Sequence, residues 1–168
     1  MKQIYLLTAA LATATLGLLA AGADKAPATT ETAAPEAKAD SPWLTNLDEA
    51  KKIAAKENKS ILIDFTGSDW CGWCIKLKKE VFSHEEFTKE AGKHFVLVEL
   101  DFPKESNQTD EEKATNKALA KEYKVEGFPT ILITDETGKA YAKTGYREGG
   151  VEPYLKHLNK LRSRKGLE

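Results

Sequence analysis

Two cysteines separated by two residues constrain the fold of this 168-residue chain more than any other feature. Cys71 and Cys74 are its only cysteines. The apolar run 60–65 before them predicts a buried strand, and the apolar spacing over 75–81 predicts a helix after them. The unpaired N–H groups and the positive dipole end at the start of a helix favour a thiolate over a thiol. The pattern therefore indicates thiol–disulfide exchange, in which Cys71 attacks and Cys74 resolves.

The short spacing of the pair argues against a structural crosslink. A disulfide that closes a loop over two intervening residues constrains the unfolded chain very little. A metal site is the other interpretation of two cysteines, but two thiolates supply only half of a tetrahedral zinc shell. His84, His94 and His157 are scattered along the sequence, so we expect no metal and no cofactor. A copper carrier that uses both thiolates is the alternative that is not an enzyme.

The first 41 residues are predicted to lie outside the folded domain. Residues 1–23 combine a positively charged start, an apolar run and a small-residue site at 21–23, which predicts a cleaved signal peptide. The alternative is an uncleaved membrane anchor. Residues 24–41 contain no large apolar side chain and are expected to form a flexible linker. We therefore expect an exported protein, periplasmic or extracellular, with one domain over 42–168.

The domain sequence alternates between helical and strand patterns. Capping residues predict helices that start near Asn46, Ser83 and Thr109, and the helix before Ser83 is expected to break near Phe82. Two glycines at 149–150 precede a last amphipathic helix. Strands are predicted over 61–65, 95–101, 131–134 and 139–145. The order predicts an α/β fold, with a central mixed sheet of about four strands flanked by helices.

Three segments together resemble the thioredoxin superfamily, and the resemblance extends over roughly 43–161. They are the strand 61–65, the Trp-Cys-Gly-Trp-Cys stretch 70–74 and the Val-Glu-Gly-Phe-Pro-Thr stretch 125–130. The sequence is most similar to exported thioredoxin-like domains, among them the carboxy-terminal domain of the membrane electron transporter of the bacterial periplasm. The resemblance implies a thioredoxin fold and the activity of a thiol–disulfide oxidoreductase.

The sequence departs from ordinary thioredoxin in several places. The loop 66–69 carries one additional residue before the cysteines, and the segment 101–127 is longer. No obvious strand precedes the first helix, so we expect one edge strand to be missing. Gly72 and Trp73 stand between the cysteines, where thioredoxin has Gly-Pro.

The resemblance assigns roles to residues outside the cysteine pair. It implies that Pro129 is a cis-proline facing the sulfurs, and that Gly127, Phe128 and Thr130 help its loop to bind the substrate backbone. The alternative is a trans-proline in an ordinary loop. The resemblance also implies that Asp64 accepts the proton of the resolving cysteine. A carboxylate within an apolar strand is costly without a purpose or a partner, and the alternative is an exposed edge-strand residue.

Two tryptophans flank the attacking cysteine. We expect Trp70 and Trp73 to form an apolar surface that docks substrate segments near a disulfide. The alternative for Trp70 is that it packs under the loop. A net charge of −1 gives no broad basic surface, so no nucleic-acid partner is expected.

The residues around the cysteines favour reduction of substrate disulfides. A strongly oxidising pair needs its reduced form stabilised by neighbouring cations or hydrogen-bond donors. Gly72 and Trp73 supply no cation, and Asp69 is negative. We therefore expect a monomeric reductase of protein disulfides that depends on a membrane thiol electron donor. A disulfide isomerase or an oxidase is the alternative.

Overall fold

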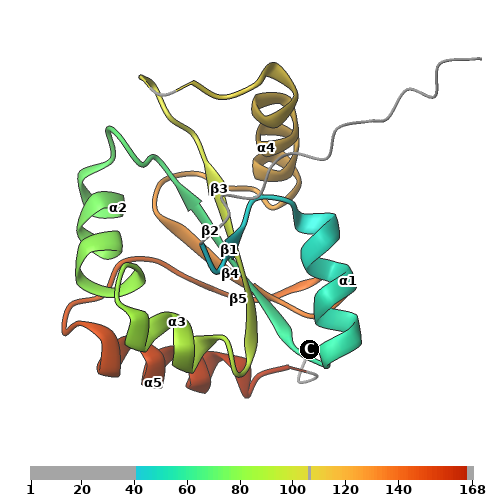
Figure 1. Ribbon diagram of the computed structural model, residues 1–168, viewed down its shortest axis with the longest axis vertical. Helices are drawn as coiled ribbons and strands as arrows, with labels where there is room; N and C mark the ends of the chain where they lie inside the picture. Colours follow the sequence, from blue (N-terminus) through green and yellow to red (C-terminus); the bar gives the residue numbers. More distant parts are fainter. Residues whose placement is uncertain (1–40, 106, 166–168) are drawn as a thin grey trace, which may run out of the picture. The chain divides into compact units, whose positions relative to one another are not determined.

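A computed structural model describes residues 41–105 and 107–165 (Figure 1). The predicted signal peptide 1–23 and nearly all of the predicted linker 24–41 lie outside these residues. The elements in chain order are β1 (Trp43–Leu44), α1 (Leu47–Glu57), β2 (Ser60–Thr66), α2 (Gly72–Leu77), η1 (Lys78–Phe82), α3 (Glu85–Ala91), β3 (Phe95–Asp101), α4 (Asp110–Glu122), β4 (Thr130–Thr134), β5 (Ala140–Thr144) and α5 (Val151–Arg162). Within the described part of the chain, no helix has the length and apolar content needed to cross a membrane.

The strands form one mixed sheet in the order β1-β3-β2-β4-β5. The strands β1, β3 and β2 run parallel, whereas β4 is antiparallel to both β2 and β5. The α/β class and the mixed sheet are as predicted, with β2 at the centre between β3 and β4.

The expectation that an edge strand is missing is wrong, because a strand is present before the first helix and brings the sheet to five strands. In β1, Trp43 pairs with Leu97 and Leu44 pairs with Val98. A strand of two residues is too short to show an alternating pattern in the sequence. The ring of Trp43 lies 4.9 Å from that of Phe82, centroid to centroid, and this packing fixes the strand at the sheet edge.

Helices cover both faces of the sheet (Figure 1). Successive side chains of a strand point to opposite faces, so Ile61, Ile63 and Phe65 of β2 pack on the side of α1 and α4. Leu62 packs on the other side, against α2, η1, α3 and α5. Asp64 is two residues beyond Leu62 and therefore faces the side covered by α2.

The break in the helix after the cysteines is confirmed, but its capping is not as predicted. The helix α2 continues into η1, a single π-helical turn, in which Ser83 N–H donates to Lys78 O. The following helix α3 begins at Glu85 with His84 as its N-cap, so the predicted capping box of Ser83 is wrong. The π-helical turn continues α2 through Phe82, so Ser83 is the C-cap of this helix and not the N-cap of the next one. The predicted capping box of Thr109 and Glu112 is confirmed.

Candidate active site

The two cysteines lie where the central strand feeds a helix. Cys71 is the N-cap of α2, and Cys74 lies within its first turn. The two sulfurs are joined in a disulfide, and the Cα atoms are 5.2 Å apart. Cys71 is 7% exposed and Cys74 is 3% exposed. Cys71 is thus the less buried of the two, and its role as the attacking cysteine stays a prediction.

The helix start supplies the hydrogen bonds that a thiolate needs. The backbone N–H of Cys74 donates to Cys71 Sγ across 3.2 Å. The first turn of α2 contains no acidic side chain, so the dipole of the helix acts on this sulfur without a competing local charge from that turn. When the disulfide is reduced, the same amide stabilises a Cys71 thiolate.

Asp64 is buried in the central strand, so the alternative of an exposed edge-strand residue is excluded. It is 4% exposed and lies on β2, between β3 and β4. Its Oδ1 atom has no hydrogen-bond partner. Burial raises the pKa of this carboxyl well above its usual range, the negative charges of Glu99 and Asp101 raise the pKa further, and Lys78 lowers it. A carboxyl of this kind can hold a proton at pH values where an exposed one is ionised.

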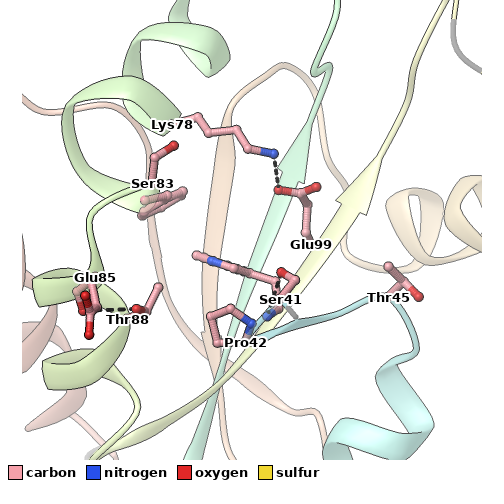
Figure 2. Close-up of a pocket in the computed structure, with 10 residues that line it drawn as sticks. Ser41, Pro42, Thr45, Lys78, Ser83, Glu85, Thr88 and Glu99 are labelled. Atoms are coloured by element: carbon pink, nitrogen blue, oxygen red, sulfur yellow. Dashed lines mark hydrogen bonds and ion pairs between the residues drawn. The ribbon is translucent and has the colours of Figure 1, made fainter. Parts of the chain in front are cut away.

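An ion pair between η1 and β3 lies beside Asp64. Lys78 Nζ is 3.0 Å from Glu99 Oε2. Figure 2 shows the two side chains meeting at one side of a pocket of about 630 Å³, which Trp43 and Phe82 also line. No local sequence pattern predicts this pair, because Lys78 and Glu99 belong to segments that meet only when the sheet forms.

The loop that contains Pro129 has the predicted conformation. The Phe128–Pro129 peptide bond is cis. The hydroxyl of Thr130 donates to Gly127 O across 2.7 Å and holds the loop closed at its base. The ring of Phe128 contacts the ring of Trp70, with centroids 5.8 Å apart. Since Trp70 precedes Cys71 and Phe128 precedes Pro129, this contact brings the proline loop beside the cysteine segment.

Trp70 is both packed and exposed, so each interpretation of it describes one part of the side chain. Its Nε1–H donates to Phe102 O across 2.7 Å. Gly67 lies directly against the indole, since a Cβ at this position would come within 2.6 Å of Trp70 Cε2. The residue is nevertheless 40% exposed, and Lys104 Nζ lies 4.3 Å from its ring centroid. The tryptophan therefore has a fixed orientation and an accessible face.

The loop 66–69 and the segment after β3 form one structural unit. In the loop 66–69, Ser68 N–H and its hydroxyl donate to the carboxylate of Asp101. The carboxylate of Asp69 accepts from the backbone N–H groups of Lys104 and Glu105. The longer loop before the cysteines therefore holds the start of the longer segment after β3.

Trp73 belongs to a separate aromatic cluster on the surface. It is 57% exposed, and its ring centroid lies 5.2 Å from that of Tyr146. Lys76 Nζ lies 5.4 Å from the Trp73 ring and 5.0 Å from the Tyr146 ring, and the Tyr146 hydroxyl donates to Glu80 across 2.7 Å. Sequence reasoning missed Tyr146, which follows β5 and shares no motif with the cysteines. The cluster is an accessible aromatic surface beside α2.

The histidines take part in local interactions away from the cysteines. His84 Nε2 donates to Lys79 O, and His157 is hydrogen-bonded to the Thr144 hydroxyl. Burial lowers the pKa of His94. No group of three or more His, Cys, Asp or Glu side chains is arranged to hold a metal ion in the part of the chain that the structure describes.

Comparison with known proteins identifies the family. The family of thioredoxin-like domains matches residues 47–160. The disulfide bond reductase DsbH of Chlamydia pneumoniae is 40% identical over 107 residues, which are 64% of this chain and 64% of that protein. The thiol:disulfide interchange protein DsbD of Actinobacillus pleuropneumoniae serotype 5b (strain L20) is 31% identical over 114 residues, which are 66% of this chain and 18% of that protein. The chain thus spans less than two thirds of the length of these curated relatives.

A solved structure also resembles the domain. The structure of a DsbH oxidoreductase has a TM-score of 0.68 at 36% sequence identity, and the match covers 72% of this chain and 83% of that chain. The likeness therefore extends from the sequence to the arrangement of the sheet and helices.

Proposed function

Because the chain belongs to the family of thioredoxin-like domains, we propose that it is an exported thiol–disulfide oxidoreductase that reduces disulfide bonds in proteins. The observation that carries this proposal is the Cys71–Cys74 disulfide at the start of α2, on the sheet face where Asp64 is buried. In this proposal Cys71, the less buried cysteine, attacks, Cys74 resolves, and Asp64 accepts the proton of Cys74.

The first step is attack by the reduced protein on a substrate disulfide. The Cys71 thiolate forms a bond to one substrate sulfur, the substrate S–S bond breaks, and the second substrate sulfur leaves as a thiolate that takes a proton from water. Trp70 and Trp73 offer apolar surface to the substrate segment, since both are exposed beside this sulfur. The loop 127–130, whose Phe128 contacts Trp70, binds the substrate backbone beside this surface.

The second step releases the substrate. The carboxylate of Asp64 accepts the proton of the Cys74 thiol, and the Cys74 sulfur attacks Cys71 Sγ. The Cys71–Cys74 bond forms while the bond from Cys71 to the substrate breaks, and the substrate sulfur leaves as a thiolate that is then protonated. Two electrons have passed from the protein to the substrate. The raised pKa of Asp64 matches its proton affinity more closely to that of a thiol than an ordinary carboxyl would.

The direction of electron flow follows from the surroundings of Cys71. Gly72 and Trp73 bring no cation to the sulfur, so the helix start is the main group that stabilises the thiolate. A couple of this kind favours the disulfide form of the protein and therefore donates electrons. The relative DsbH is named a disulfide bond reductase, which supports this direction.

The cellular context follows from the amino-terminal sequence. Residues 1–23 serve as a cleaved signal peptide and residues 24–41 as a linker, which places the domain in the periplasm or outside the cell. A reductase in an oxidising compartment needs a donor, and a membrane thiol transporter would supply the electrons. Amino-terminal sequencing of the exported protein is expected to start near Asp24, and a retained Met1 in the membrane fraction would contradict export in free form.

Equilibration against glutathione buffers tests the function. The fraction of reduced Cys71–Cys74 is measured by thiol alkylation at a series of ratios of reduced to oxidised glutathione. A reductase is expected to remain in its disulfide form until the buffer is strongly reducing. A pair that is reduced readily by the glutathione pool would make the protein a disulfide donor. If the purified protein instead keeps copper bound in the presence of a competing chelator, the alternative function of a copper carrier is favoured.

A further inference from the structure

The buried carboxyl of Asp64 has a charged neighbour on the adjacent strand. Asp64 of β2 and Glu99 of β3 are paired residues in the parallel register. Residues paired in this way point to the same face of a sheet, so both side chains face α2 and η1. Lys78 reaches Glu99 from η1, and its Nζ lies 3.0 Å from Glu99 Oε2.

The ion pair lies between the buried carboxyl and open space. Asp64 is 4% exposed, whereas the side chains of Glu99 and Lys78 are 19% and 51% exposed. Both members of the pair line the pocket of about 630 Å³ (Figure 2). Asp64 is not among the residues that line it, and its Oδ1 atom has no hydrogen-bond partner. Glu99, the strand neighbour of Asp64, and Lys78 therefore connect the buried carboxyl to this pocket.

The other charged or titratable groups that face Asp64 are unsuited to carry its proton. Asp101 of β3 is held by hydrogen bonds from Ser68. Tyr154 of α5 is fully buried, its hydroxyl donates to Gly145 O across 3.0 Å, and burial raises its pKa far above the usual range. Cys74 of α2 is the proton donor of the proposed reaction. Of the charged neighbours of Asp64, the Lys78–Glu99 ion pair therefore remains as the one that can influence its proton exchange.

We propose that the Lys78–Glu99 ion pair controls proton exchange between Asp64 and the solvent of the pocket, and that both residues are positioning residues for the resolving step. This proposal rests on the proposed role of Asp64 as proton acceptor. The proton taken from Cys74 leaves Asp64 for the solvent of the pocket beside this ion pair, which returns Asp64 to its ionised form for the next cycle. No oxidant or further reactant enters this step.

The two members of the pair act on Asp64 with opposite signs. The negative charge of Glu99 disfavours an ionised Asp64, and the positive charge of Lys78 favours it. Loss of the negative charge lets Asp64 ionise at lower pH, so the resolving step keeps its proton acceptor in more acidic solution. Loss of the positive charge leaves Glu99 uncompensated and keeps the proton on Asp64 to higher pH.

Charge-removing variants of each member provide the test. Glu99→Gln and Lys78→Gln are compared with Glu90→Gln and Lys93→Gln, which remove the same charges from the exposed pair Lys93–Glu90, 2.6 Å apart. The carboxyl titration of Asp64 is followed by NMR in the oxidised protein, and the resolving step is timed from pre-formed mixed disulfides across pH. We expect the midpoint for Asp64 to fall in Glu99→Gln and to rise in Lys78→Gln. At acidic pH, we expect the resolving step to be faster in Glu99→Gln and slower in Lys78→Gln, each by about threefold or more.

Several results would overturn the proposal. If both variants shift the midpoint in the same direction, or by no more than the Glu90 and Lys93 controls, the pair does not control Asp64. The same variants in an Asp64→Asn background separate this failure from that of the proposed function. If Asp64→Asn alone leaves the resolving step unchanged, then Asp64 is not the acceptor and both proposals fail. Suppose instead that Asp64→Asn slows the resolving step, but that Glu99→Gln still alters the pH profile of this step in the Asp64→Asn protein. Then Asp64 remains the proton acceptor, and only the proposed control by the ion pair is wrong.

Discussion

The indole ring of Trp70 lies almost perpendicular to the ring of Phe128, with 5.8 Å between their centroids. This contact joins the residue before the attacking cysteine to the residue before the cis-proline, although the two are far apart in the sequence. Phe128 also packs on Phe102, whose carbonyl accepts the hydrogen bond of the indole. The mutual position of Cys71 and Pro129 therefore depends on one aromatic unit of three rings.

Substitution of Trp70 should affect both stability and catalysis. Trp70→Ala removes a hydrogen bond, the ring contact with Phe128 and the contact with the Lys104 ammonium, so we expect the free energy of unfolding to fall by about 1–3 kcal/mol and substrate reduction to slow. Urea unfolding and the rate of reduction of a protein disulfide measure the two effects. Trp73→Ala is the control, since Trp73 is 57% exposed and contacts only a surface cluster; it should raise KM with little loss of stability. Equal destabilisation by both variants would contradict the fixed position of Trp70.

The cysteines should differ in the intermediates that they accumulate. Cys74→Ala leaves Cys71, the less buried cysteine, able to attack but removes the resolving sulfur, so we expect mixed disulfides with substrates to accumulate. Cys71→Ala leaves only the more buried Cys74 sulfur, so this variant should form few mixed disulfides. Trapping with a disulfide-containing protein, followed by non-reducing electrophoresis, measures both. The opposite pattern would exchange the two roles.

Asp64 should make the stability of the oxidised protein depend on pH. Its pKa in the folded state lies above the unfolded value, so the folded state binds more protons between those two pH values. The free energy of unfolding should therefore fall as pH rises from about 4, by at most about 1.4 kcal/mol per pH unit. Asp64→Asn should remove this component of the decline, and it should slow the resolving step. Urea unfolding of both proteins at pH 5 and pH 8 measures it, and parallel pH profiles would show that Asp64 is not perturbed.

Candidate site residues could be predicted from the sequence where a short, continuous stretch of residues contains the pattern. A charged residue inside an apolar run identified Asp64, and the two-residue spacing identified the cysteines. The strand β1 could not be found, because two residues carry no periodicity and Trp43 is held by rings from η1 and α3. The capping error at Ser83 has a similar cause, since a π-helical turn moved the end of one helix. Glu99 lies in a correctly predicted strand, but its position beside Asp64 depends on strand register, which no local pattern contains.

The loop 66–69 should control the order of the segment that follows β3. The carboxylate of Asp69 accepts from the N–H groups of Lys104 and Glu105, at 3.0 Å and 2.7 Å. Charge-assisted bonds to backbone amides contribute more than exposed ion pairs do, so we expect Asp69→Ala to lower the free energy of unfolding by about 1–2 kcal/mol. Hydrogen exchange at those two amides should become faster, because they lose their acceptor, while the amides of β2 keep their protection.

Glu90→Ala provides the matched control for this last substitution. Glu90 is an acidic residue whose carboxylate pairs with Lys93 on the surface, and its loss should change stability very little, because exposed ion pairs contribute little. If Asp69→Ala leaves exchange at 104 and 105 unchanged, the loop before the cysteines does not hold the segment after β3. If the exchange becomes faster and the Lys104 side chain also leaves the Trp70 ring, then one surface loop sets the face that Trp70 offers to substrates. Fluorescence of Trp70 in a background that carries both Trp43→Phe and Trp73→Phe would report that change, since the chain has three tryptophans.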